Sequence, residues 1–198
     1  RDNMSELLSY AETQNLLDEL PNEHQKLVGE VVPNQISVGG IQRVLQNLLN
    51  ERVSIRDLPT ILEGISEACA FTRNVTQLTE HVRSRLARQI SEQNSTEDNF
   101  IPLVTLSAEW EQIFSDSILD QGEDKQLSMA PSQLQRFIGA VRTTLDELAD
   151  KEDPPVVLTS PTARPFVRSI IERFRPTTSI MSQNELHPKA KIKTLGQI

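Results

Sequence analysis

The sequence predicts a helical unit followed by a smaller α/β unit. Through residues 1–94 the apolar residues recur at steps of three and four, which is the spacing of one helix face. After residue 95, short apolar runs rich in β-branched residues alternate with helical patterns. The polar, acidic, turn-prone segment NSTEDN separates the two patterns. We therefore expect an all-α subdomain over 1–94 and an α/β subdomain over 95–198 with about four mixed strands.

The stretch ISVGGIQRVLQNLLNERVSIRDLPTILEGI at 36–65 contains the strongest helical pattern of the chain. It predicts helices over about 38–50 and 57–70, joined by the polar turn ERVSIRD. Asp57 has the right position to N-cap the second helix, and Pro59 lies in its first turn, where a missing N–H is harmless. The two apolar stripes comprise Val38, Ile41, Val44, Leu45, Leu48 and Leu49, and Leu58, Ile61, Leu62 and Ile65.

Further helices are expected on both sides of this pair. One continues from the start of the chain through 2–9, and Ser9 with Glu12 has capping-box spacing for another that begins near Tyr10. Pro21 opens a helix that stops before a second proline. A capping pair at 74 and 77 predicts one long helix over 74–93.

In the second half, strands are expected near 100–106, 155–159 and 179–182, and in the alternating tail KAKIKTLGQI. The segment DQGEDK is expected to be a loop. Helices are predicted after Ser107, over 131–150, and after Ser160 with Pro161 as the first helical residue. The strand–helix–strand order of 155–182 favours a right-handed parallel crossover. The tail alternates, with its lysines on one side and Ala190, Ile192 and Thr194 on the other, which predicts a strand with one solvated face. The lysines also suit the edge of a sheet.

Composition excludes several classes of protein. No apolar run approaches the ~20 residues of a membrane helix, and the single cysteine, Cys69, allows no internal disulfide. The net charge is −8, divided into −13 over residues 1–160 (13 basic, 26 acidic) and +5 over 161–198 (7 basic, 2 acidic). An acidic chain is a poor ligand for nucleic acid or anionic lipid. The basic end either neutralises acidic surface of this protein or a neighbouring subunit, or binds an acidic partner.

No group of residues predicts catalysis or a cofactor. Cys69 falls on an apolar helix face and is expected to be a buried thiol. The histidines at 24, 81 and 187 have no metal-site spacing. Gly39-Gly40 lacks the lysine and hydroxyl residue of a phosphate loop, so we expect these glycines to serve helix packing or the turn after Ser37. The acidic pairs at 109/111 and 146/147 indicate solubility alone.

The helix pair also allows a second interpretation, a helix-turn-helix nucleic-acid-binding module. Its connection is longer than the usual three or four residues. Residues 38–93 carry seven basic and six acidic side chains, without the excess of positive charge that a recognition surface needs.

The run QRVLQNLLNERVSIRDLPTILE resembles the signature stretch in the cytoplasmic half of the FlhA family of export-gate proteins, from flagellar and related type III secretion systems. The resemblance extends through SELLSYAETQNLLDEL before it and LTSPTARPFVRSIIERF after it, and so covers nearly the whole chain. It implies that the two halves are the third and fourth of four cytoplasmic subdomains. The chain begins with Arg1 in a helical pattern, and we expect it to be an excised fragment of an inner-membrane protein whose membrane part lies upstream.

The resemblance further implies a non-enzymatic, nine-membered ring that docks export chaperones with their cargo and contacts the export ATPase complex and the substrate-specificity switch protein. Two candidate surfaces follow. The first faces a neighbouring protomer and comprises Gln42, Arg43, Arg52, Arg56 and Asp57, unless Arg56 and Asp57 only cap and brace the helix pair within one subunit. The second binds acidic cargo or chaperone and comprises Arg164, Arg168, Arg173, Arg175, Lys189, Lys191 and Lys193.

Overall fold

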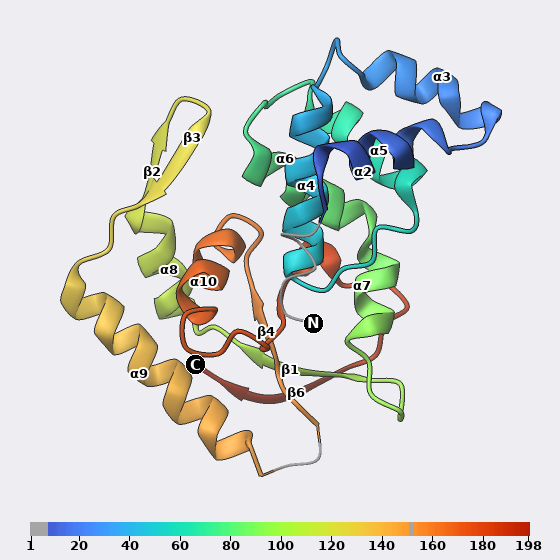
Figure 1. The fold of residues 1–198 in the computed structure, drawn as a ribbon. Helices are drawn as coiled ribbons and strands as arrows, with labels where there is room; N and C mark the ends of the chain where they lie inside the picture. The colour runs from blue at the N-terminus through green and yellow to red at the C-terminus, as the bar shows by residue number, and fades with distance from the viewer. Residues whose placement is uncertain (1–7, 151–152) are drawn as a thin grey trace. The chain divides into compact units, whose positions relative to one another are not determined.

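The computed structural model describes residues 8–150 and 153–198. The chain forms two compact units, residues 1–86 and 87–198 (Figure 1). The helix expected over 2–9 falls almost entirely outside the described residues. Its last two positions, Leu8 and Ser9, are described and are not helical.

The first unit is built from helices, as the sequence predicts. They are α2 (Tyr10–Asp18), α3 (Asn22–Val31), α4 (Val38–Asn50), α5 (Leu58–Ala68) and α6 (Val75–Arg85). Three predicted N-caps are confirmed: the side chains of Ser9, Asn74 and Asp57 accept hydrogen bonds from the backbone N–H groups three residues later. The prediction of a single helix over 74–93 is wrong. Leu86 adopts φ −98° and ψ 18°, and α6 ends there.

The predicted apolar stripes form the core of the first unit. α4 and α5 both pack against α6. The glycine of α5 allows one close approach, since a Cβ on Gly64 would lie 3.2 Å from Val82 Cγ2 and 3.3 Å from Val82 Cα. Each fully buried Leu, Ile or Val contributes roughly 1.5–3 kcal/mol through burial. The fully enclosed residues of these helices are Ile41, Val44, Leu45, Leu48, Ile61, Leu62, Ile65, Leu78 and Val82.

A four-stranded parallel sheet forms the centre of the second unit. Its strands are β1 (Ile101–Thr105), β4 (Val156–Thr159), β5 (Ile180–Ser182) and β6 (Ile192–Gln197), in the order β5-β4-β1-β6. The expected α/β class and the parallel pairing of β4 with β5 are confirmed. β6 is an edge strand, as the lysines of the tail indicated.

Helices α8 (Ala108–Ser117), α9 (Pro131–Leu148) and α10 (Arg164–Ile171) lie on one side of this sheet (Figure 1). The core between them contains a group of aromatic rings in edge-to-face contact. Phe137 lies 4.9 Å from Phe114 and 5.2 Å from Trp110 between ring centroids. α9 is confirmed with nearly its predicted bounds.

Three expectations for the second unit are wrong. The segment DQGEDK is the end of a hairpin of β2 (Ile118–Gln121) and β3 (Asp124–Leu127), with Gly122 in the turn at φ 70°. α10 begins at Arg164 rather than at 161, because Ser160 Oγ caps a preceding turn by accepting the Ala163 N–H at 3.2 Å. The alternation of the tail does not mark a buried face, since Ile192 is 53% exposed.

The short helix α7 (Ala87–Gln93) belongs to the second unit, so the compact units separate before NSTEDN, at 86/87. Ser91 accounts for this placement. Its Oγ donates to Glu185 O at 2.8 Å and accepts from His187 N at 2.9 Å, which fixes α7 to the 3-10 helix η1 (Gln183–Glu185) and the chain that follows it. Among the described helices, none combines the length and apolar character that a membrane crossing requires.

Candidate interaction surfaces

The turn after α4 is a Schellman motif with an arginine at the position that glycine usually occupies. Arg52 N donates to Leu49 O and Val53 N to Leu48 O, both at 2.9 Å. Arg52 has φ 63°, in the left-handed region, and Val53 is 3% exposed. The backbone therefore holds this turn in one shape and presents Arg52 at the surface.

The end of the same turn is occupied by the cap of α5. Asp57 Oδ1 accepts the Thr60 N–H at 3.3 Å, and Oδ2 accepts the Thr60 hydroxyl at 2.7 Å. Arg56 engages Ser54 Oγ through its backbone N–H at 3.3 Å, and its side chain is exposed. Asp57 therefore caps α5 within its own subunit, which was the alternative to a contact with a neighbouring protomer. The side chain of Arg56 is exposed and does not cap.

A buried ion pair fixes the start of the turn after α4, and the sequence did not predict it. Arg83 on α6 lies 3.6 Å from Glu51, and their side chains are 3% and 14% exposed. On the neighbouring helix, Gln42 Nε2 donates to Leu8 O at 3.1 Å. Gln42 therefore holds the chain that enters α2. Arg43, one position on, is exposed.

The first surface is consequently narrower than the five residues of the sequence prediction. Arg43, Arg52 and Arg56 present their side chains to solvent, while Gln42 and Asp57 form hydrogen bonds within their own unit. Nearby basic residues do not add to it: Arg83 is enclosed, and Arg85 bridges Glu63 and Glu67 at 2.8 and 3.2 Å. These internal pairs weaken the helix-turn-helix interpretation further.

The second predicted surface includes one residue that cannot contact a partner. Arg164 is 2% exposed, its Nε lies 3.5 Å from Glu185 Oε2, and its guanidinium donates to Ile180 O at 3.0 Å. The prediction of a partner-binding role is wrong for Arg164. It is instead half of a buried ion pair that fixes α10 to β5 and η1.

The other arginines of this segment divide between internal and exposed positions. Arg168 pairs with Glu172 at 3.4 Å, and Arg175 with Asp146 at 3.0 Å. Arg173 is exposed. The lysines also lie in two different places. Because β6 begins at Ile192, Lys189 and Lys191 belong to the preceding loop. Lys193 lies on the strand, with its ammonium 5.4 Å from the centroid of the Phe100 ring.

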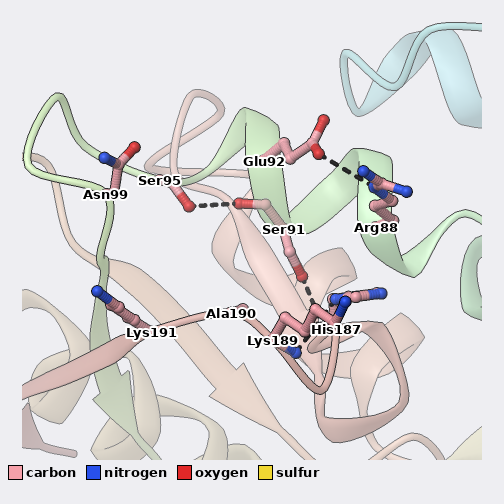
Figure 2. Close-up of a pocket in the computed structure, with 9 residues that line it drawn as sticks. All are labelled: Arg88, Ser91, Glu92, Ser95, Asn99, His187, Lys189, Ala190 and Lys191. Carbon is pink, nitrogen blue, oxygen red and sulfur yellow. Dashed lines mark hydrogen bonds and ion pairs between the residues drawn. The ribbon is translucent and has the colours of Figure 1, made fainter.

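Lys189 and Lys191 line a cavity of about 380 Å³ in the second unit (Figure 2). The cavity lies between α7 with the loop that follows it and the segment 187–191. Arg88 and His187 line it too, together with Ser91, Glu92, Ser95, Asn99 and Ala190. Residues far apart in the sequence thus assemble a basic pocket that no local pattern could predict.

The charges around this cavity favour an anion. Arg88 pairs with Glu92 at 3.3 Å, but their side chains are 80% and 70% exposed, and a pair so exposed is worth at most about 1 kcal/mol. His187 Nδ1 accepts the Lys189 N–H at 3.2 Å, so a proton on the neutral ring resides at Nε2. One carboxylate thus stands against two ammonium groups, a guanidinium and an imidazole. These side chains can hold an anionic group through charge-assisted hydrogen bonds.

The other residues that the sequence singled out have structural roles. Cys69 is 9% exposed, as expected of a buried thiol. A Cβ on Gly40 would collide with the side chain of Ile36, directly before the N-cap Ser37, so this glycine leaves room for the turn into α4. Glu111 is more than a solubilising acid: its Oε1 accepts from Thr159 Oγ1 at 2.9 Å and from Ser160 N at 3.0 Å. His81 bonds to Glu67 at 2.8 Å. In the part of the chain that the structure describes, no three His, Cys, Asp or Glu side chains gather as metal ligands do.

The chain thus combines a helical unit with a parallel α/β unit that has charged surfaces and a basic pocket. Comparison with known proteins assigns the family. The model of the FHIPEP family matches residues 1–191, and the chain belongs to that family. It is 54% identical to flagellar biosynthesis protein FlhA of Caulobacter vibrioides over 198 residues, which are the whole of this chain and 28% of that protein.

Solved structures show the same fold. The chain is similar to a nonameric cryo-EM structure of EPEC SctV-C, with a TM-score of 0.86, 27% identity, and coverage of 100% of this chain and 59% of that one. It is similar as well to the Chlamydia pneumoniae CdsV protein solved in complex with CdsO, with a TM-score of 0.88, 29% identity, and coverage of 98% and 57%. The chain therefore spans little more than a quarter of the full-length relative and more than half of these solved domains.

Proposed function

We propose that this chain is the C-terminal part of the cytoplasmic region of an export-gate protein, anchored in the bacterial inner membrane by a part outside this sequence. In the flagellar or a related type III secretion system it works as a non-enzymatic platform in a nine-membered ring. The observation that carries the proposal is the family match over residues 1–191. The nonameric state of SctV-C, whose fold this chain shares, supports the ring.

The partners of the platform are export chaperones with their cargo, the export ATPase complex and the substrate-specificity switch protein. CdsV, which has been solved in complex with CdsO, supports the idea that proteins of this fold engage another protein. Within this chain we assign acidic partners to the basic cavity, where Lys189 and Lys191 oppose Arg88. Arg173 and Lys193 are exposed but do not line that cavity, and we do not assign the partner to them.

The test of docking uses the whole protein in cells. Lys189→Glu with Lys191→Glu should reduce both co-purification of chaperone–cargo complexes and export of cargo, because two attractive charges become repulsive to an acidic partner. Lys193→Glu is the matched control, since it reverses a lysine of the same tail outside the cavity. Unchanged co-purification in the double variant, or an equal loss in the control, would contradict the assignment to the cavity.

We assign the contact with a neighbouring protomer to the exposed arginines of the first unit. Arg52 supports this, because an arginine held at φ 63° gives up conformational stability that glycine would provide at that position. Arg43→Glu with Arg52→Glu in the whole protein should lower the fraction of assembled rings and the amount of exported cargo. Lys26→Glu reverses an exposed charge of α3 and serves as control. Ring formation and export at the level of that control would remove the proposal.

A further inference from the structure

The second unit has an apolar groove that is separate from the basic cavity. Its volume is about 250 Å³, and it lies between the first part of α9, the end of α10 and the residues after β3. An engineered cavity of about 150 Å³ holds a benzene molecule, so this groove has room for one or two bulky side chains. The lining residues are Leu127, Met129, Leu134, Ile138, Phe166, Ser169, Ile170, Arg173 and Phe174.

The apolar side chains of the groove are only partly covered by the chain itself. Leu127, Met129, Leu134, Ile138, Phe166 and Phe174 pack against the buried core with one side and remain partly accessible on the other. The accessible side of each residue leaves apolar area in contact with water. A partner that covered this area would gain about 25 cal/mol of binding free energy per Å² buried. Partly exposed apolar side chains gathered in one hollow are typical of a protein-binding site.

The rim of the groove is positively charged on both walls. Arg173 lines it in the turn after α10, and Arg142 on α9 stacks over the Phe174 ring with 5.0 Å to the centroid. Within residues 8–150 and 153–198, no acid lies within ion-pair distance of either arginine. The nearby acids Asp146 and Glu172 already pair with Arg175 and Arg168. In a chain of net charge −8, these two arginines form a local positive edge, which attracts acidic groups and repels basic ones.

We propose that this groove binds an amphipathic helix of a partner protein, with bulky apolar residues on one face and acidic residues beside them. The positive charge of the rim favours acidic residues in the ligand, and the shape of the walls favours a helical ligand. Both long walls are helices, and a helix packs its ridges of side chains into the groove between two others. Anchors at i, i+3, i+4 and i+7 would enter the hollow, and the flanking carboxylates would meet Arg142 and Arg173.

The test uses designed peptides and this 198-residue chain. The probe is a helical peptide of about 18 residues, roughly 27 Å long, with Leu and Phe on one face and Glu on its flanks. Its matched control keeps the apolar face and carries Lys in place of Glu. Fluorescence anisotropy should show binding of the acidic peptide at least about tenfold tighter than of the basic one. Methyl signals of Met129, Leu134 and Ile138 should shift on binding.

Two variants locate the site without removing any core residue. Ser169→Trp fills the groove from an exposed position, and Arg142→Glu with Arg173→Glu reverses the rim; each should weaken the acidic peptide by about tenfold or more. Lys193→Glu reverses a charge outside both the groove and the basic cavity, and should leave the affinity unchanged. A loss of affinity in Lys189→Glu with Lys191→Glu instead would show that the peptide occupies the basic cavity, and would overturn the proposal while leaving the docking assigned to that cavity standing. Equal binding of both peptides, or methyl shifts elsewhere, would overturn the proposal. Self-association that Ser169→Trp abolishes would also overturn it, by identifying a second copy as the occupant.

Discussion

Replacing Arg164 by methionine should destabilise the second unit strongly. Methionine keeps the bulk of the side chain but leaves the carboxylate of Glu185 in a site that is 1% exposed, without its partner. It also removes the donor to Ile180 O. Breaking a buried ion pair in this way costs about 3–5 kcal/mol. For a domain whose total stability is on the order of 5–15 kcal/mol, that is a large fraction.

The second unit can be followed separately because the sequence contains one tryptophan, Trp110, in its core. Urea unfolding monitored by tryptophan fluorescence therefore reports this unit, even where the two units unfold independently. With a slope of about 2 kcal/mol per molar urea, a loss of about 4 kcal/mol lowers the midpoint by about 2 M.

Two further variants make the reasoning on Arg164 refutable. Arg88→Met breaks a pair with 80% and 70% exposed side chains, and should change stability by less than about 1 kcal/mol. Arg164→Met combined with Glu185→Leu removes both buried charges, and should recover most of the loss. A midpoint for Arg164→Met no lower than that of Arg88→Met would refute the account of the buried pair.

Three predictions concern local structure, each measured by the far-UV CD melting or urea midpoint. Arg52→Gly should stabilise the first unit by about 1 kcal/mol, because glycine adopts the left-handed region without strain, and an unchanged midpoint would contradict a strained Arg52. Gly139→Ala should stabilise the second unit by about 1 kcal/mol, since nothing lies within 4 Å of the added Cβ. Gly40→Ala should destabilise the first unit, because its added Cβ collides with Ile36. A change of the same sign in both variants would refute the packing argument. Asp57→Ala should cost about 1 kcal/mol through loss of the cap, and Asp57→Asn much less.

The features that the sequence predicted well depend on local patterns. The apolar stripes of α4 and α5 recur every three or four residues, and the caps by Ser9, Asp57 and Asn74 need only the next three positions. Both signals are contained in a short window, and tertiary contacts do not reverse them. The resemblance of the central stretch added the family, which the match over residues 1–191 confirmed.

The features that it missed depend on partners far away in the chain. Ser91 and Glu185, whose bond places α7 in the second unit, are 94 positions apart. Arg164 has the appearance of a surface residue in sequence, because nothing around it shows that Glu185 will meet it in the core. The hairpin of β2 and β3 resembles a loop in sequence, since its strands have little apolar character and are largely exposed. The basic cavity likewise exists only after α7 and the segment 187–191 come together.

The number of copies in the assembled protein tests the central claim most directly. Native mass spectrometry of the whole protein, extracted from the membrane, should give a complex of nine copies, as in the nonameric SctV-C structure. Arg43→Glu with Arg52→Glu should shift that complex toward single copies, and Lys26→Glu should leave it intact. A protein that stays monomeric at every concentration, or that assembles with another number of copies, would contradict a nine-membered platform.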